Sequence, residues 1–208
     1  MKAGFIGAGN VASTFGRHLV IAGHTVVVSN SRGPETLADF VADLGPGALA
    51  GTKQQAAECD AVILATNWVG VADALKGIDW RGRILIDATN AHLDPIPDIS
   101  LEGVTRSRAA LKGRTSSEIV AEMAVGARLV KSLCNMPMIW IQDLSPNKPR
   151  TVFFTSGDDT EAKRLVIDLV NSTGFAAVDL GSLAKGGAMY EVGSPLSGIE
   201  FHMVRRLR

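Results

Sequence analysis

The sequence predicts an α/β fold with a doubly wound, mostly parallel β-sheet that helices cover on both faces. Short apolar segments rich in β-branched residues alternate with longer segments whose apolar residues recur at helical spacing. Continuous apolar runs of this kind are typical of strands that are buried on both faces. Because the alternation continues along the whole chain, we expect strand–helix order throughout, ending in a small C-terminal α/β extension.

Seven short apolar segments are expected to form strands. They are residues 3–7, 25–29, 61–65, 84–87, 129–133, 151–155 and 175–180. The last two of these strands, with a helix between them, belong to the predicted extension.

Amphipathic segments predict the helices between these strands. The first follows residue 10, because Val11, Ala12, Phe15 and Leu19 share one face, and Gly23 offers a C-terminal stop. A second helix is expected to begin at Pro34, and a third, shorter one to cover residues 53–58.

The middle of the chain is less regular. Residues 89–113 contain Pro95 and Pro97, so we expect a long connection with at most a short helix. Thr115 then begins an S/T-x-x-E capping box that ends at Glu118 and predicts a helix start.

Two further helices are expected in the last third of the chain. Asp158 is expected to cap one, whose apolar face consists of Ala162, Leu165, Val166, Leu169 and Val170. Pro195 is expected to open the other, with an apolar face made of Leu196, Ile199, Met203 and Leu207.

Composition excludes several classes of function. The 208 residues carry 21 basic and 21 acidic side chains, so the chain lacks the basic field on which nucleic-acid binding relies. No apolar run approaches the roughly 20 residues that span a bilayer, and no signal peptide is expected. Cys59 and Cys134 are not spaced as metal ligands, and the four histidines are scattered, so we expect no metal. Two isolated thiols suit a reducing cytoplasm.

The first strand leads into a G-x-G-x-x-A motif formed by Gly7, Gly9 and Ala12. Gly7 permits a tight turn, Gly9 lets the backbone approach a pyrophosphate, and Ala12 keeps the helix close to the sheet. The free N–H groups at the helix start, next to Asn10 and Val11, suit an anion. In this strand–turn–helix context the motif predicts a dinucleotide site on a Rossmann fold.

The end of the second strand indicates which dinucleotide binds. An NAD site normally places an acid there to hold the ribose 2′-hydroxyl, but this chain has Asn30, Ser31 and Arg32 after Ser29. A guanidinium matches phosphate oxygens with a fork of N–H groups. The sequence therefore favours NADP(H).

Polar loops after the next two strands should line the same crevice, because the carboxyl ends of parallel strands meet at one edge. Ala65, Thr66, Asn67 and Trp68 end or follow the third strand, although Trp68 is equally well explained as a packed aromatic. After the fourth strand, Thr89 and Asn90 have the polarity to hold the nicotinamide ribose.

These motifs together resemble the F420-dependent NADP oxidoreductase family, also called NADPH-dependent F420 reductases. The resemblance covers nearly the whole chain. Besides Trp68, it rests on residues 7–12, 29–35, 87–90, 116–122, 130–137, 156–159, 181–183 and 186–187.

The resemblance implies that NADP(H) binds in the N-terminal crevice and exchanges a hydride with a flat acceptor such as coenzyme F420 or a flavin. It also implies that Cys134, Asn135, Met136 and Pro137 bind this substrate. The family pattern leads us to expect His or Asn at position 134 and Thr at position 135, and this sequence departs from both. We expect residues 1–134 to form the NADP-binding domain and residues 135–208 the extension that closes the pocket.

Hydride transfer between two rings needs alignment and exclusion of water, but no protein acid or base, so no catalytic side chain is predicted. Cys134 is either a redox thiol or a small buried apolar residue, and Tyr190 and Glu191 could close the pocket. Two alternatives remain open. One is a β-hydroxyacid or pyrroline-carboxylate dehydrogenase, which strands in the last third disfavour, and the other is a non-catalytic NADP(H)-binding redox sensor. The expected partner is a small molecule, and the resemblance also suggests a homodimer.

Overall fold

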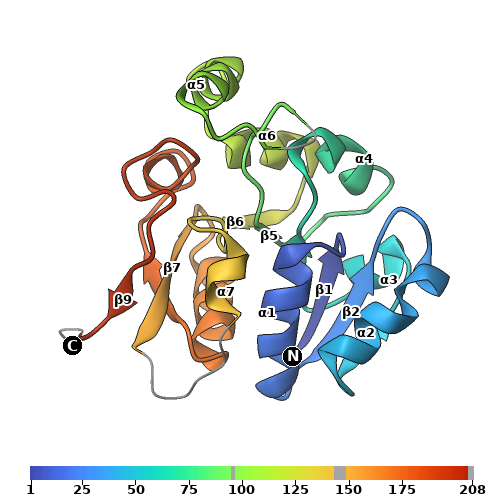
Figure 1. The fold of residues 1–208 in the computed structure, drawn as a ribbon. Coiled ribbons are helices and arrows are strands. Elements are labelled where there is room, and N and C mark those ends of the chain that lie inside the picture. Colours follow the sequence, from blue (N-terminus) through green and yellow to red (C-terminus); the bar gives the residue numbers. More distant parts are fainter. Residues whose placement is uncertain (95–96, 143–148, 206–208) are drawn as a thin grey trace.

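A computed structural model describes residues 1–94, 97–142 and 149–205 of the chain. In this part, nine strands form one sheet in the order β3-β2-β1-β4-β5-β6-β7-β8, with β9 paired to β7 (Figure 1). The strands are β1 (Lys2–Ile6), β2 (Thr25–Ser29), β3 (Ala48–Ala50), β4 (Ala61–Leu64), β5 (Ile84–Asp87), β6 (Arg128–Lys131), β7 (Arg150–Gly157), β8 (Ala176–Asp179) and β9 (His202–Met203).

Along the order from β3 to β8 the direction of the strands changes once, and β9 pairs antiparallel with β7. Strands β1 to β6 are mutually parallel, β7 runs antiparallel to β6, and β8 is parallel to β7. From β1 the chain builds outward to β2 and β3, and then returns to add β4 on the other side. Open α/β sheets bind ligands at such a switch point, outside the carboxyl ends of the strands.

Seven α-helices and four 3₁₀ helices connect the strands in the described residues. They are α1 (Asn10–Ile21), η1 (Pro34–Leu37), α2 (Ala38–Leu44), α3 (Lys53–Ala57), η2 (Trp68–Gly70), α4 (Val71–Leu75), α5 (Leu101–Ala110), α6 (Ser116–Met123), η3 (Met138–Ile141), α7 (Thr160–Ser172) and η4 (Gly187–Met189). None of the helices in these ranges is both long and apolar enough to cross a membrane.

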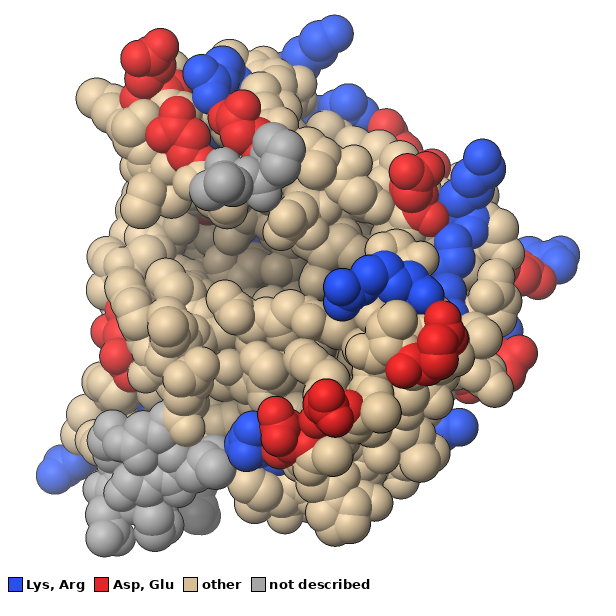
Figure 2. All heavy atoms as spheres, turned by 45° about the vertical axis from the view of Figure 1, so that its right-hand side comes forward, with Lys and Arg blue, Asp and Glu red and all other residues tan. Residues whose placement is uncertain are grey.

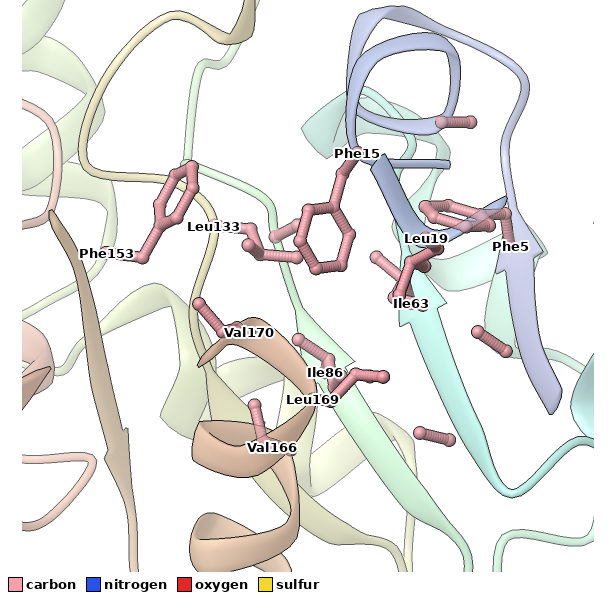
Figure 3. Packing of buried hydrophobic residues seen from close by; sticks show 14 of the residues in the cluster. Phe5, Phe15, Leu19, Ile63, Ile86, Leu133, Phe153, Val166, Leu169 and Val170 are labelled. Atoms are coloured by element: carbon pink, nitrogen blue, oxygen red, sulfur yellow. The ribbon is translucent and has the colours of Figure 1, made fainter. Parts of the chain in front are cut away.

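The two faces of the sheet carry separate apolar cores. On one face, Phe15 and Leu19 of α1 and Leu169 of α7 pack over Phe5 of β1 and Ile86 of β5 (Figure 3). The opposite core is formed by residues of α3, α4 and α6, which pack over alternate residues of the same strands. Helices therefore cover both faces, and the predicted doubly wound Rossmann-like fold is confirmed.

The capping box predicted at Thr115 is confirmed. The Thr115 hydroxyl accepts the backbone N–H of Glu118, while the Glu118 carboxylate accepts the Thr115 N–H at 2.8 Å. Two orphan donors at the start of α6 are thereby satisfied.

The predicted final helix is wrong. After Pro195 the chain makes turns and then forms β9, which places Met203 opposite Arg150 of β7. Gly198 adopts a left-handed backbone (φ +71°), which interrupts a right-handed helix, and the N–H of Val152 instead pairs with the carbonyl of Phe201. Leu207, assigned to that helix, lies outside the described residues.

The expected cap of α7 is wrong, the helix in the expected connection is longer than predicted, and two short elements were not predicted. The cap of α7 is Asp159, whose carboxylate accepts the Ala162 N–H, whereas the Asp158 carboxylate accepts the N–H of Leu183. The segment expected to be mainly a connection contains the ten-residue helix α5. β3 and α4 were not anticipated, because a three-residue strand and a five-residue helix are too short to show a period.

Candidate dinucleotide crevice and acceptor cavity

The loop between β1 and α1 has two glycines with different structural roles. Gly7 has φ +119°, and a Cβ there would collide with the carbonyl oxygen of Ala65, so the fold itself needs glycine. A Cβ on Gly9 would meet nothing within 4 Å. Gly9 is also the N-cap of α1 and offers no side chain to its N–H groups. These N–H groups therefore face open space suited to an anion.

The loop after β2 is organised by Asn30. Its amide oxygen accepts the N–H groups of Arg32 at 3.0 Å and Gly33 at 2.9 Å, and its amide nitrogen donates to Thr36. The side chains of Ser31 and Arg32 are exposed. Asn30 therefore shapes the turn, and Arg32 is the cation of this turn that can reach a ligand.

One carboxylate lies closer to this turn than its place in the sequence suggests. The Glu35 carboxylate folds back over Gly33, where an added Cβ would collide with it. The negative charge of Glu35 repels an anion that the positive charge of Arg32 attracts. Glu35 should therefore weaken the binding of a phosphate at this turn.

The loops after β4 and β5 enclose a cavity of about 150 Å³. Its lining contains five of the predicted cofactor-binding residues, Thr66, Asn67, Trp68, Thr89 and Asn90, together with Ala88, His92, Asp94 and Pro97. Ala65 is not among the lining residues, but packs against Gly7 instead. The Thr66 hydroxyl is buried and has no hydrogen-bond partner within the described ranges, which makes it available to a ligand.

Thr89 is more deeply committed to the fold than the sequence suggests. It is 2% exposed, and both its N–H and its hydroxyl donate to the Asp87 carboxylate, at 2.9 and 2.7 Å. Thr89 therefore contributes to the shape of the cavity and not to hydrogen bonding with a ligand.

Asn90 connects three segments of the chain. Its amide nitrogen donates to the carbonyl of Cys134 at 2.9 Å, and its amide oxygen accepts the N–H of Val192 at 3.3 Å. The loop after β5, the loop after β6 and the segment after η4 are thereby joined at one residue.

A larger cavity of about 590 Å³ adjoins the first and shares Asn90, His92 and Pro97 with it. All four predicted substrate-binding residues, Cys134, Asn135, Met136 and Pro137, line it. The walls that sequence reasoning missed are Ile99, Val104, Trp140, Val192, Gly193, Ser197 and Gly198. Figure 2 shows the molecule hollowed on one face, with mostly uncharged side chains inside the hollow.

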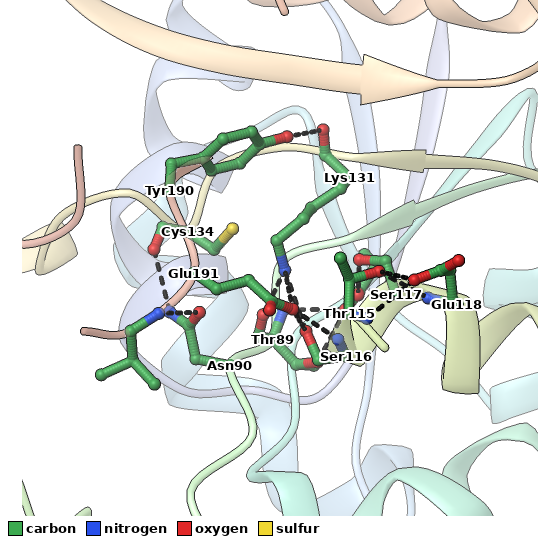
Figure 4. Close-up of polar contacts among 12 residues, drawn as sticks. Thr89, Asn90, Thr115, Ser116, Ser117, Glu118, Lys131, Cys134, Tyr190 and Glu191 are labelled. Carbon is green, nitrogen blue, oxygen red and sulfur yellow. Dashed lines mark hydrogen bonds and ion pairs between the residues drawn. The ribbon is translucent and has the colours of Figure 1, made fainter. Parts of the chain in front are cut away.

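A buried ionic network lies behind this cavity (Figure 4). The Lys131 ammonium is fully buried, donates to the Ser116 hydroxyl at 3.0 Å, and lies 3.8 Å from the Glu191 carboxylate. That carboxylate also accepts the N–H and the hydroxyl of Ser116. The Tyr190 hydroxyl donates to the carbonyl of Lys131 at 2.8 Å.

The network fixes the segment that follows η4. Tyr190 and Glu191 are buried and do not line the larger cavity, whereas Val192 and Gly193, which follow them, do. Removing one partner of a buried ion pair leaves an uncompensated charge, so the network holds this wall firmly in place. In the sequence, Lys131 directly follows the apolar residues Leu129 and Val130 of β6, which is a weak sign of a buried charge.

The network also determines the state of the Cys134 thiol. Burial raises the pKa of Cys134 to about 12, since desolvation outweighs the attraction of the Lys131 ammonium. Desolvation by itself would lower the pKa of Lys131, but Cys134, Asp87 and Glu191 more than offset it and leave this pKa raised. At neutral pH the thiol is therefore protonated and the amine charged, which favours the interpretation of Cys134 as a packing residue over that of a redox thiol.

Residues 2–91 match the family described as NADP oxidoreductase, coenzyme F420-dependent. A crystal structure of a hypothetical protein from Sinorhizobium meliloti is 33% identical, with a TM-score of 0.83, over 97% of this chain and 95% of that chain. The N-terminal part of the chain, residues 2–91, therefore belongs to this family of NADP oxidoreductases.

Two other proteins resemble the chain more distantly. A candidate F420-dependent NADP reductase from Arthrobacter sp. FB24 shares the fold, with a TM-score of 0.64, 22% identity, and coverage of 88% of this chain and 85% of that chain. The metalloreductase STEAP3 of Rattus norvegicus is 26% identical over 88% of this chain. The chain spans about a third (34%) of the length of that curated relative.

The family match ends at a meaningful place in the structure. It covers the loops after β1, β2, β4 and β5, and stops at residue 91, before the remaining walls of the larger cavity. The family relationship therefore concerns the crevice more directly than the larger cavity.

The crevice, which consists of the loops after β1, β2, β4 and β5, fits the dinucleotide that the family name implies. Gly9 leaves the approach to the α1 N–H groups open, the Thr66 hydroxyl is buried without a partner, and Arg32 provides an exposed cation beside β2. The N–H groups of α1 suit a pyrophosphate, and the exposed cation suits a 2′-phosphate. The buried hydroxyl suits a ribose or an amide group.

Proposed function

We propose that the protein is an NADP(H)-dependent oxidoreductase that transfers a hydride between the nicotinamide ring and a flat acceptor such as coenzyme F420 or a flavin. The observation that carries this proposal is the pair of adjoining cavities at the carboxyl edge of the sheet. They share Asn90, His92 and Pro97, so ligands in the two cavities would lie next to each other.

The crevice residues would bind and orient the dinucleotide. The N–H groups that follow Gly9 would bind the pyrophosphate, and Arg32 the 2′-phosphate. Trp68, Thr66 and Asn67 would surround the nicotinamide end in the smaller cavity. Bound NADP(H) supplies the hydride-carrying carbon of its nicotinamide ring.

The larger cavity suits a flat organic molecule. Its volume of about 590 Å³ lies within the 300–1,000 Å³ that is usual for small-molecule sites. Met136, Pro137, Trp140, Ile99 and Val104 give it apolar walls against which a ring can pack. Apolar walls also exclude water, which hydride transfer requires.

The absorbance of reduced nicotinamide tests the proposal directly. Purified protein with NADPH is mixed with oxidised coenzyme F420 and, separately, with FMN. We expect rapid oxidation of NADPH with at least one of them, and slower oxidation of NADH. Turnover with F420 would show that Cys134 and Asn135 are tolerated in a deazaflavin site, while turnover with FMN alone would assign the site to flavins.

The Gly9→Val variant is the matched control, because the rate that depends on the enzyme must disappear with it. Tight NADPH binding without turnover on either carrier would contradict the proposal and favour the redox sensor instead. Turnover of small hydroxy acids or cyclic imines, without either carrier, would favour the dehydrogenase alternative.

A further inference from the structure

We propose that His92 is a catalytic residue that accepts the proton released when a reduced flat carrier delivers its hydride to NADP⁺. This inference rests on the proposed function and adds to it the proton-transferring group that the sequence did not reveal.

His92 lies where the two cavities meet. It follows β5, its backbone N–H donates to the carbonyl of Asn90 at 2.8 Å, and it is among the lining residues of both cavities. Three residues line both cavities. The amide of Asn90 is already hydrogen-bonded to the backbone of Cys134 and of Val192, and the side chain of Pro97 has no proton to exchange. His92 is therefore the titratable residue common to both.

The imidazole ring of His92 has unused hydrogen-bonding capacity. Nδ1 of His92 is buried, and no residue in the described ranges binds it. A buried imidazole is normally fixed in one tautomer by a partner on its second nitrogen. Since the described residues provide none for Nδ1, this nitrogen remains available as an acceptor of a proton.

The charged groups around His92 keep the ring neutral. Desolvation lowers its pKa, and Asp98 opposes this effect only partly. Asp94, which lines the smaller cavity, and Asp98 both pair with Arg106 of α5, at 2.6 and 3.5 Å, so their charges are partly compensated. A neutral imidazole at physiological pH is able to accept a proton.

The other titratable groups in the two linings are less suitable. Cys134 is a neutral thiol whose pKa is about 12. Asp94 is an exposed carboxylate that is paired with Arg106. His92 is the described lining residue whose ordinary pKa lies closest to neutrality.

The proton and electron balance assigns one step to His92. In the oxidation of a reduced carrier, a hydride with both electrons goes to C4 of the NADP⁺ nicotinamide. A ring nitrogen of the carrier loses its proton, which a nitrogen of His92 accepts, and the oxidised carrier and NADPH result. In the reverse direction, protonated His92 returns the proton to the carrier, and exchange with solvent resets the ring.

The test compares pH profiles in the direction of NADP⁺ reduction, with reduced F420 or reduced flavin as donor. For the wild type, kcat should fall as the pH drops through the pKa of His92, because protonated His92 cannot act as a base. In His92→Gln, which keeps the size and polarity of the side chain, kcat should fall by about 100-fold or more and lose this pH step. The affinity for NADPH should change little.

A second variant separates chemistry from structure. Imidazole added to the solution should restore part of the activity of His92→Ala and should not affect the wild type. His24→Gln, which changes a surface histidine bonded to Ser172, should match the wild type in rate and in pH profile.

Each outcome bears on a different statement. If the wild type turns over and His92→Gln keeps its rate and pH profile, His92 is not the base, while the proposed function stands. If His92→Gln is slow but keeps the pH step, and imidazole does not rescue His92→Ala, then His92 has a structural role and the inference is wrong. If the wild type binds NADPH and oxidises neither reduced carrier, the proposed function fails and the inference fails with it.

Discussion

The crevice and the larger cavity meet at Asn90, but they are built differently. The crevice is formed by the short loops that directly follow β1, β2 and β4 and by the first residues after β5. The larger cavity combines the connection to α5, the residues after β6, and a segment after η4 from near the C-terminal end. One region is encoded by short local motifs, and the other by contacts between distant segments.

This difference corresponds to the extent of the family match. The family match covers the crevice loops and ends at residue 91. The departures from the family pattern, at Cys134 and Asn135, lie in the larger cavity. We therefore expect crevice substitutions to act on NADPH binding, and cavity-wall substitutions to act on the second substrate.

The largest effect should come from Gly9→Val. The fold has room for the added side chain, since a Cβ there meets nothing within 4 Å, but that space is where a pyrophosphate would lie. NADPH binding, followed by nicotinamide fluorescence, should be lost, while the unfolding midpoint stays close to that of the wild type. Gly7→Val provides the contrast, because it should lose binding by destabilising the fold. A folded Gly9→Val protein that still binds NADPH would place the cofactor elsewhere.

The second effect concerns the network behind the larger cavity. Lys131→Met leaves the buried Glu191 carboxylate without its cation and should reduce the free energy of unfolding by about 3–5 kcal/mol in urea denaturation. Where the variant remains folded, turnover should fall more than NADPH affinity, because Val192 and Gly193 lose their support.

The double variant Lys131→Met/Glu191→Gln should recover part of this stability, since it removes both charges and keeps acceptors for Ser116. A loss below about 1 kcal/mol in the single variant would mean that the ion pair contributes little.

Arg32→Ala should weaken NADPH binding by about 10- to 100-fold and leave NADH binding nearly unchanged, because a charge-assisted hydrogen bond contributes about 1.5–3 kcal/mol. Glu35→Gln is the matched charge variant, and it should tighten NADPH binding slightly by removing the opposing carboxylate. Equal losses for both cofactors in Arg32→Ala would argue against a 2′-phosphate site at this turn.

The smallest effect should come from Cys134. A pKa of about 12 leaves roughly a thousandfold less thiolate than in an ordinary cysteine, so iodoacetamide at pH 8 should leave Cys134 unmodified in the native protein. Mass spectrometry before and after unfolding in urea checks this. Cys134→Ala should change turnover less than tenfold, and rapid native alkylation would restore the redox interpretation.

Local signals in the sequence were sufficient for much of the fold. Gly7, Gly9 and Ala12 predicted the turn from β1 into α1, and Thr115 with Glu118 predicted the start of α6. Pro195 was misleading, because apolar residues at helical spacing occur there in a segment whose Gly198 is left-handed and whose backbone pairs with β7. Periodicity does not report such long-range pairing.

The candidate site also combines features that the sequence predicts with features that depend on long-range contacts. The polarity of Asn90 was evident from the sequence, but its role in joining Cys134 to Val192 depends on a contact across 102 residues. His92 was seen only as one of four scattered histidines, because its importance comes from the two cavities that it borders.

The contact between Ser116 and Glu191 affects the order in which the molecule can be completed during synthesis. A ribosome releases all six parallel strands before it makes Glu191, which lies 75 residues beyond its partner Ser116. Closing so long a loop is slow compared with forming the local turns of the crevice. The crevice can therefore assemble on a growing chain, whereas the wall containing Val192 and Gly193 must wait until the segment after η4 has been made.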